Sequence, residues 1–139
     1  KIAMDVNLYS NKIIIDEILK KRIKFKSLIT ISSGASLKTK FGWFPYSATK
    51  SALKFLIENY ALENKQNHFI NYCPGIIETN MQKNIRKINV NNIPSIKRFK
   101  ELYDKKLIQS PEEAALTFFL YLNKLKKLKS GTYVDIRKI

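Results

Sequence analysis

The chain has 139 residues with 45% hydrophobic and 12% aromatic side chains, which suits one packed domain and excludes collagen-like, disordered and low-complexity proteins. Its 26 Lys and Arg against 11 Asp and Glu give a formal net charge of +15, which raises the question of a polyanionic partner. No apolar run approaches the roughly 18 residues of a membrane-spanning helix, and the single Cys73 cannot form an internal disulfide. We therefore expect a reducing, cytoplasmic setting and no membrane association.

The first half of the chain predicts a helix, a strand and a second helix. Residues 2–22 repeat apolar side chains at helical spacing, which indicates a helix with one buried face. Residues 27–32 are a short β-branched run, typical of a strand buried on both sides in a parallel sheet. After a loop over 34–45, a helix is expected over 46–63. Its predicted inner face comprises Ala48, Ala52, Phe55, Leu56 and Tyr60.

The second half continues the alternation. Residues 68–73 predict a strand that a Pro-Gly pair ends, and residues 76–108 suggest short helices and loops of a lid. Ser110 and Glu113 flank a proline in the pattern of a capping box, so a helix should begin there and precede a last strand over 132–136. Its predicted buried face comprises Ala114, Ala115, Phe118, Phe119 and Leu122. Alternating helices and strands favour parallel pairing, hence an α/β fold.

Tyr46 and Lys50 have a spacing with chemical use. Four positions apart at the start of a helix, they project from one face about one turn from each other. A phenol is a poor proton donor or acceptor at neutral pH, but a nearby ammonium favours the phenolate and makes proton transfer accessible. The pair by itself is a weak signal, since a rim tyrosine beside a solvated lysine has the same spacing.

Two strand ends add to this pair. Ser33 follows the first predicted strand, at the sheet edge where open α/β folds bind ligands, and could donate a hydrogen bond to a substrate carbonyl oxygen. Pro74 and Gly75 follow the second predicted strand and leave backbone free for close approach of a ligand. Taken singly, Ser33 could be a turn cap and Pro74-Gly75 a strand stop. Together they predict one crevice lined by adjacent strand ends.

Considered jointly, these residues resemble the short-chain dehydrogenase/reductase family. The ordered motif is Ser33, then Tyr46 thirteen residues later, then Lys50, while Asp5-Val6-Asn7-Leu8 is similar to the helix segment that holds the family's fourth catalytic residue, Asn7. Residues 74–79 resemble its cofactor motif and 130–135 its final strand. Residues 31–35, Gly42-Trp43, and 78–82 followed by Arg86 are most similar to the sepiapterin reductase and benzil reductase branch.

The resemblance implies hydride transfer between a nicotinamide and a small carbonyl or alcohol substrate. It implies that Tyr46 passes a proton to the carbonyl oxygen that Ser33 steadies, and that Lys50 favours the phenolate and binds the nicotinamide ribose. Asn7 would hold a water of the proton relay. The implied cofactor-binding residues are Tyr46, Lys50, Pro74, Gly75, Ile77 and Thr79. The implied substrate-binding residues are Ser33, Gly34, Trp43, Phe44 and Met81.

The resemblance also bears on cofactor and assembly. It implies NADP or NAD, with NADP favoured by the branch, and a homodimer or homotetramer formed through the helices over 2–22 and 46–63. The residues contain no glycine-rich strand, turn and helix and no Asn-Ala-Gly stretch, and they begin at Lys1. We therefore expect residues 1–139 to be one partial domain, the second half of a doubly wound, Rossmann-like parallel sheet with three strands and flanking helices. We expect such a piece to be inactive by itself.

Two other functions stay open at this stage. One is a non-catalytic basic binding module, and the other is a degenerate gene remnant. Against a specific nucleic-acid partner, only 4 of the 26 cations are arginine, the lysines are dispersed, and frequent Lys, Ile and Asn suggest an A/T-rich coding bias. The sequence offers no candidate set of metal ligands, and His68, inside a predicted strand, is interpreted as structural.

Overall fold

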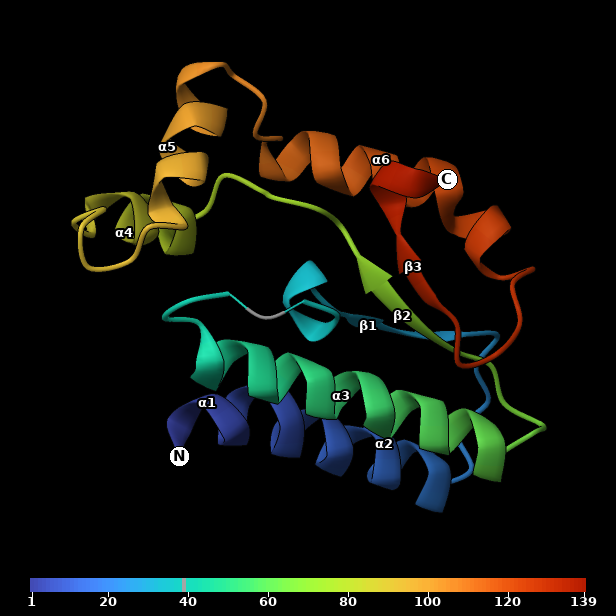
Figure 1. The fold of residues 1–139 in the computed structure, drawn as a ribbon. Coiled ribbons are helices and arrows are strands. Elements are labelled where there is room, and N and C mark those ends of the chain that lie inside the picture. The colour runs from blue at the N-terminus through green and yellow to red at the C-terminus, as the bar shows by residue number, and fades with distance from the viewer. Residues whose placement is uncertain (39) are drawn as a thin grey trace.

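A computed structural model describes residues 1–38 and 40–139 as a sheet of three parallel strands with helices on both faces (Figure 1). The strands are β1 (Leu28–Ile31), β2 (Phe69–Cys73) and β3 (Tyr133–Asp135), in the order β1-β2-β3. Both neighbouring pairs are parallel. The predicted α/β class, the parallel pairing and the three strands are therefore confirmed.

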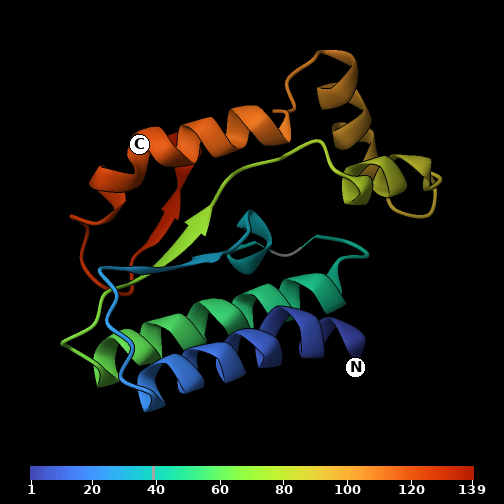
Figure 2. The same ribbon diagram turned by 180° about the vertical axis from the view of Figure 1, so that it is seen from behind.

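One face of the sheet is covered by the first half of the chain. Helix α1 (Ile2–Met4), a π-helical turn (Asp5–Tyr9) and α2 (Ser10–Lys20) follow one another without a break and lie beside α3 (Phe44–Glu63) below the strands in Figures 1 and 2. Helix α3 begins two residues earlier than the sequence predicts, because Pro45 occupies its first turn, where a missing N–H does no harm.

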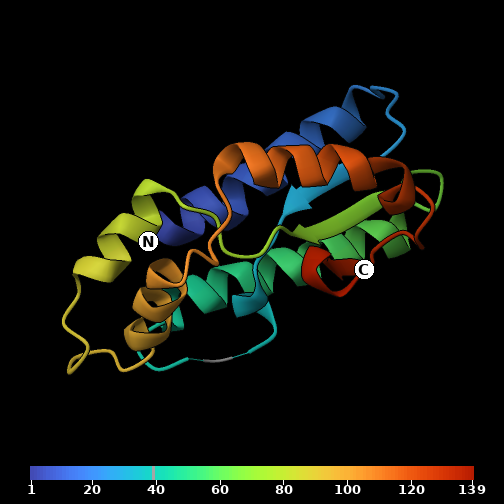
Figure 3. The ribbon, with the colours of Figure 1, turned by 90° about the horizontal axis from the view of Figure 1, so that it is seen from above.

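The opposite face is covered by α6 (Pro111–Leu125), which crosses above the strands in Figure 3. The predicted capping box is present: the Ser110 hydroxyl accepts the Glu113 N–H at 3.1 Å, and the Glu113 carboxylate accepts the Ser110 N–H at 2.7 Å. The segment before α6 folds into the short helices α4 (Asn80–Lys87) and α5 (Ile96–Asp104), as expected of a lid. In the described part of the chain, no helix is both long enough and apolar enough to cross a bilayer.

The core is divided by the sheet into two clusters. On the α2 and α3 side, buried residues pack around Phe69, and on the α6 side they pack around Ile70 and Tyr72. Successive residues of β2 thus enter opposite layers, as the two-residue period of a strand requires. All five residues of β2 are buried, because helices cover both of its faces. This rigid central strand ends where the candidate site begins.

Two predicted inner faces are partly wrong. Phe55 of α3 and Phe119 of α6 are 61% and 69% exposed, and Ala115 of α6 is exposed too, whereas the fully buried side chains of α3 are Thr49, Leu53 and Ile57. Both helices are apolar on more than one side, so spacing alone does not decide which side meets the sheet. The orientation is decided by packing against β2 and the neighbouring helix.

Strand β1 is an edge of the sheet, and its outer flank is apolar. Ile31 is 54% exposed although the sequence predicts a strand buried on both sides. Beside it an open hollow of about 350 Å³ is walled almost entirely by apolar side chains, which include Tyr72, Ala115, Phe118 and Phe119. The folded chain therefore presents an uncovered hydrophobic flank next to β1.

Candidate active site

A cleft of about 370 Å³ lies at the carboxyl ends of the strands. Its walls come from residues 31–35 after β1, residues 73–77 after β2, the start of α3, α4, α5 and the end of the chain. Three of the predicted catalytic side chains line it: Ser33, Tyr46 and Lys50. Parallel strands bring these segments together because all their carboxyl ends lie at one edge.

Ser33 is placed by the turn that ends β1. Its backbone is extended, and its hydroxyl oxygen accepts the N–H of Ala35 at 3.2 Å, which caps a short 3-10 turn over Gly34–Ser36. Ser33 therefore caps a turn and also lines the cleft, so both of its predicted roles are compatible with the structure. Because Oγ acts as acceptor in this bond, the hydroxyl hydrogen is left to donate to another acceptor in the cleft.

Lys50 is held against the end of β1. Its Nζ donates to the carbonyl of Ile31 at 3.0 Å and lies 6.0 Å from the ring centroid of Tyr46. Burial lowers the pKa of Lys50 from its ordinary value. The ammonium is thus directed into the cleft rather than into bulk water, and two of its three N–H groups have no partner among the described residues.

The backbone of Tyr46 is tied to the first helical segment through Thr49. The Thr49 hydroxyl donates to the Tyr46 carbonyl at 2.8 Å and accepts the side-chain amide of Asn7 at 3.2 Å. Thr49 is 1% exposed. Asn7 lies in the π-helical turn, and its own carbonyl accepts the Asn11 side chain at 3.1 Å. Asn7 therefore lies behind the cleft wall, connected to Tyr46 by two hydrogen bonds through Thr49.

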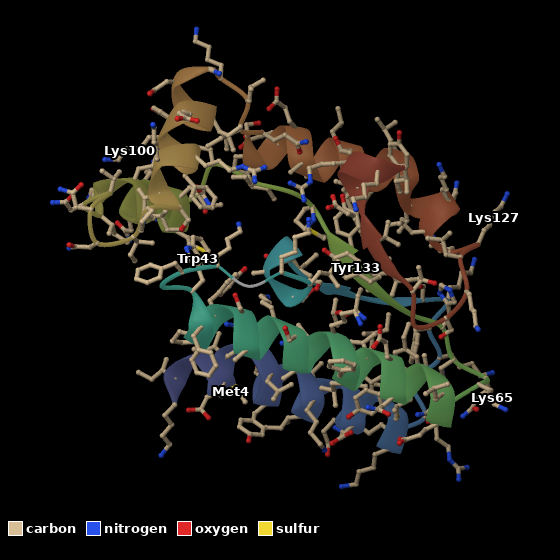
Figure 4. The ribbon with its side chains drawn as sticks, viewed as in Figure 1. Met4, Trp43, Lys65, Lys100, Lys127 and Tyr133 are labelled. Atoms are coloured by element: carbon tan, nitrogen blue, oxygen red, sulfur yellow. The ribbon has the colours of Figure 1, made fainter. Side chains whose placement is uncertain are left out.

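An aromatic wall faces the Tyr46 side of the cleft. Trp43 meets Tyr46 edge to face at 5.9 Å and stacks on Phe99 of α5 at 5.3 Å. Its indole N–H donates to the Ser95 hydroxyl at 2.9 Å. Figure 4 shows Trp43 between the start of α3 and the α4 and α5 segment. The Nζ of Lys40 lies 5.2 Å from the ring centroid of Trp43 and 5.2 Å from that of Phe99, within the range of cation–π attraction.

The floor of the cleft is the turn after β2. Gly75 has a φ of +87°, a region that favours glycine, and a Cβ there would meet Cδ of Arg137 at 3.2 Å. Arg137 is held in turn by a bidentate pair with Asp135 at 2.8 and 2.6 Å. This pair lowers the pKa of Asp135 and keeps it ionised. The Pro74-Gly75 turn thus packs directly beneath a fixed arginine.

The lid is fastened to the strand end by a second ion pair. Both terminal guanidinium nitrogens of Arg86 on α4 donate hydrogen bonds to the Glu78 carboxylate, at 2.8 and 2.6 Å. The guanidinium carbon lies 3.9 Å from the ring centroid of Tyr103 on α5. The hydrogen bonds from Arg86 lower the pKa of Glu78. Glu78, α4 and α5 are thereby joined beside Thr79 and Met81, which line the cleft.

The chain has the features of one family. The family model described as short chain dehydrogenase matches residues 1–89, which include Asn7, Ser33, Tyr46, Lys50 and Pro74-Gly75. The chain belongs to the short-chain dehydrogenase family. The predicted resemblance to this family is therefore confirmed.

Curated relatives and solved structures agree with the family. The chain is 32% identical to benzil reductase ((S)-benzoin forming) of Bacillus cereus over 65% of its length and 38% of that protein, and 28% identical to sepiapterin reductase of Bos taurus over 79% and 40%. A short chain dehydrogenase/reductase from Saccharomyces cerevisiae has the same fold, with a TM-score of 0.82 at 23% identity over 96% of this chain and 55% of that one. The chain thus spans less than half the length of these curated relatives.

The short-chain dehydrogenase fold brings most predicted site residues to the cleft but not all. Ser33, Gly34, Trp43, Tyr46, Lys50, Pro74, Gly75, Ile77, Thr79 and Met81 line it. Phe44 and Asn7 do not. Phe44 is 80% exposed and faces a separate hollow beside Ala48 and Ser51, and Asn7 lies behind the wall, bonded to Thr49. His68 lies at the far end of β2, where it bridges the Ser27 hydroxyl at 2.7 Å and the Leu128 carbonyl at 2.8 Å, a structural position as predicted.

Several residues of this short-chain dehydrogenase site escape sequence reasoning. Thr49 links Asn7 to Tyr46, and Lys40, Gln82, Arg98 and Phe99 line the cleft. A threonine three residues after a helical tyrosine was a readable signal for Thr49, because its hydroxyl commonly bonds a carbonyl one turn back. The others offer no such signal, since Lys40 in the loop before α3, Gln82 on α4 and the two residues of α5 reach the cleft only through the tertiary fold.

Proposed function

We propose that this chain forms the catalytic half of an NAD(P)-dependent carbonyl reductase or alcohol dehydrogenase. The observation that supports it is the meeting of Ser33, Tyr46 and Lys50 in one cleft at the strand ends, next to the Pro74-Gly75 turn. A small-molecule carbonyl is the substrate class. A bound reduced nicotinamide would supply the hydride.

The proton chemistry falls to residues of this chain. The free hydroxyl hydrogen of Ser33 donates to the substrate carbonyl oxygen and steadies the negative charge that grows there. Tyr46 gives its phenolic proton to the same oxygen, and the nearby Lys50 ammonium favours the phenolate that remains. Asn7 holds the water that returns a proton, and it also positions Tyr46 through Thr49.

The cleft residues fit the nicotinamide end of a dinucleotide. The two unpaired N–H groups of Lys50 suit ribose hydroxyls, and the Pro74-Gly75 turn lines the same cleft. Pro74, Ile77 and the Thr79 hydroxyl complete this side. Gly34, Trp43 and Met81 form the substrate wall, while Phe44 lies outside the cleft. The branch resemblance favours NADP over NAD.

These residues contain no binding motif for the adenine half of a dinucleotide. The chain's four glycines are Gly34, Gly42, Gly75 and Gly131, so it contains no glycine-rich turn that would bind a pyrophosphate at a helix start. We expect residues 1–139 as one partial domain to bind a whole dinucleotide weakly and to turn over poorly by themselves. Titration of the chain with NADPH, followed by the quenching of Trp43, tests this, and micromolar affinity would contradict it.

Association through the long helices is part of the proposal. Large apolar side chains of α2, α3 and the π-helical turn are exposed, including Val6, Ile13, Ile14, Phe55 and Leu62. Such surfaces are typical of homodimer interfaces, which exclude water from both copies. Sedimentation velocity should find a dimer or tetramer, and Phe55→Lys should dissociate it. A monomer at all concentrations would contradict association through these helices.

The central experiment is reduction of benzil by the gene product that contains these residues, with and without Tyr46→Phe. Loss of the proton donor should lower kcat by about 10²–10⁴-fold while NADPH binding is unchanged. Tyr9→Phe is the matched control, because Tyr9 is 50% exposed on the outer helices and should retain full activity. Undiminished turnover by Tyr46→Phe would remove Tyr46 from the acid role.

A further inference from the structure

The walls of the cleft are strongly cationic. Among the described residues that line it, six are cations and one is a carboxylate. The cations are Lys38, Lys40, Lys50, Arg98, Arg137 and Lys138. The carboxylate, Asp135, is engaged by Arg137 in a bidentate pair, so it neutralises that residue and not the others. The cleft therefore has a positive field that its own residues do not balance.

Lys40 and Arg98 are the cations nearest the aromatic wall. Lys40 lies over the stacked Trp43 and Phe99 rings, and Arg98 precedes Phe99 on α5. Neither cation makes an ion pair within residues 1–38 and 40–139. Partial burial, followed by the charges of Arg98 and Arg137, lowers the pKa of Lys40. Lys40 and Arg98 thus line one cleft as exposed cations with no counter-ion among the described residues, an arrangement that suits an anion.

A neutral hydrogen-bonding group lies in the same cleft. Gln82 of α4 is 8% exposed, and its side-chain oxygen has no hydrogen-bond partner among the described residues. A buried carbonyl oxygen without a donor is costly unless a ligand supplies one. Gln82 therefore offers an acceptor to an N–H or O–H group of a bound molecule in the same cleft, and the negative charge is left to the cations.

We propose that the substrate is an oxo acid, whose carboxylate lies against Lys40 and Arg98 while its carbonyl oxygen lies between Ser33 and Tyr46. This inference rests on the proposed function. The carbonyl carbon gains a hydride from the reduced nicotinamide, the carbonyl oxygen gains the proton of Tyr46, and the carboxylate is unchanged, so the product is a hydroxy acid. The flat Trp43 and Phe99 surface suits a planar or aromatic body next to the carboxylate.

The test compares benzoylformate with its methyl ester, which differ only in the negative charge. Calorimetric titration of the chain should give at least about tenfold tighter binding of the acid, as expected of one charge-assisted contact. Trp43 is the only tryptophan, so its fluorescence reports binding at the cleft itself. Equal affinities for the two ligands, or no binding of either, would overturn the inference.

Charge variants separate a local site from the general +15 charge. Lys40→Gln and Arg98→Gln should each reduce the preference for the acid about tenfold, with circular dichroism confirming the fold. Lys65→Gln removes the same charge at the opposite end of the molecule, where Figure 4 shows Lys65, and should leave the preference unchanged. An equal loss in Lys65→Gln would mean unspecific attraction and would refute a built site.

Two further measurements are needed. One shows whether the cations bind the substrate carboxylate or the cofactor phosphate, and the other shows which of the two proposals is wrong if activity does not follow expectation. Nicotinamide mononucleotide should bind the Lys40→Gln and Arg98→Gln variants as it binds the unaltered chain; weakened mononucleotide binding with an unchanged acid preference would assign these cations to the cofactor. If the gene product reduces the ester as well as the acid, the oxo-acid inference is wrong and the proposed function stands. If the acid binds but Tyr46→Phe retains turnover, the proposed proton donor is wrong and the oxo-acid preference stands.

Discussion

Thr49 joins the backbone of Tyr46 to the side chain of Asn7. Its hydroxyl donates to the Tyr46 carbonyl at 2.8 Å and accepts the Asn7 amide at 3.2 Å, across 42 residues of sequence between Asn7 and Thr49. The π-helical turn that holds Asn7 is thereby fastened to the first turn of α3. The position of the phenol consequently depends on a buried hydroxyl that does not itself line the cleft.

We expect Thr49→Val to destabilise the fold by about 1–3 kcal/mol, because the isosteric change removes both hydrogen bonds and leaves the Asn7 amide unpartnered. Urea denaturation of the chain measures this loss. In the gene product the same change should lower kcat and leave NADPH binding intact, as displacement of Tyr46 requires. Thr49→Ser retains the hydroxyl and should restore most of kcat; a valine variant as active as the serine variant would show that the link does not position Tyr46.

Gly75→Ala should destabilise the chain by about 1–3 kcal/mol, because alanine is strained at a φ of +87° and its Cβ would press on Arg137. Gly34→Ala is the matched control at the neighbouring strand end. Its nearest atom would lie 3.7 Å away, an ordinary contact, so its stability should change by less than about 0.5 kcal/mol. Equal losses in the two variants would contradict the role of the left-handed turn.

Arg86→Met should loosen the lid, because it removes both hydrogen bonds to Glu78 while retaining an apolar stem beside Tyr103. Amide hydrogen exchange should accelerate in α4, and Lys87→Met on the same helix should not change it. Since the pair lowers the pKa of Glu78 below its ordinary 4.5, its contribution is complete above pH 4.5 and is lost as pH falls through the lowered value. The difference in α4 exchange rate between the original chain and Arg86→Met should therefore shrink in acid. A difference in exchange rate that does not change with pH would argue against the ion pair.

Tyr60→Phe should weaken the contact between α3 and α2 by about 1 kcal/mol, because the Tyr60 hydroxyl donates to the Asp16 carboxylate. Hydrogen bonds from Lys12 and Tyr60 lower the pKa of Asp16 below its ordinary 3.8. The stabilisation is therefore complete above pH 3.8 and is lost as pH falls through the lowered value. Thermal denaturation over a series of pH values from 7 downward measures it, and a Tyr60→Phe effect of constant size over the whole series would rule out the charged partner.

The order of elements was predictable because its signals are local. The capping box of Ser110 and Glu113 spans three residues, and the strand ends at Ser33 and Pro74-Gly75 are marked by residues that stop strands. Parallel strands necessarily bring their carboxyl ends to one edge, so the sequence predicts Ser33, Tyr46 and Lys50 at one cleft, where the structure has them. The position of each helix face was less certain, as Phe55 shows.

The sequence by itself determined the α/β order, because short-range spacing and strand topology suffice for it. It indicated the family and the three polar side chains of the cleft through the resemblance of its ordered motifs to the short-chain dehydrogenase/reductase family. Only the tertiary structure decided that Thr49 lies between Asn7 and Tyr46 and that α5 brings Arg98 and Phe99 to Lys40. The contacts of Asn7 with Thr49 and of Lys40 with Phe99 join residues more than 40 positions apart. They depend on how loops close and which apolar side of a helix is buried, and no local pattern encodes that choice.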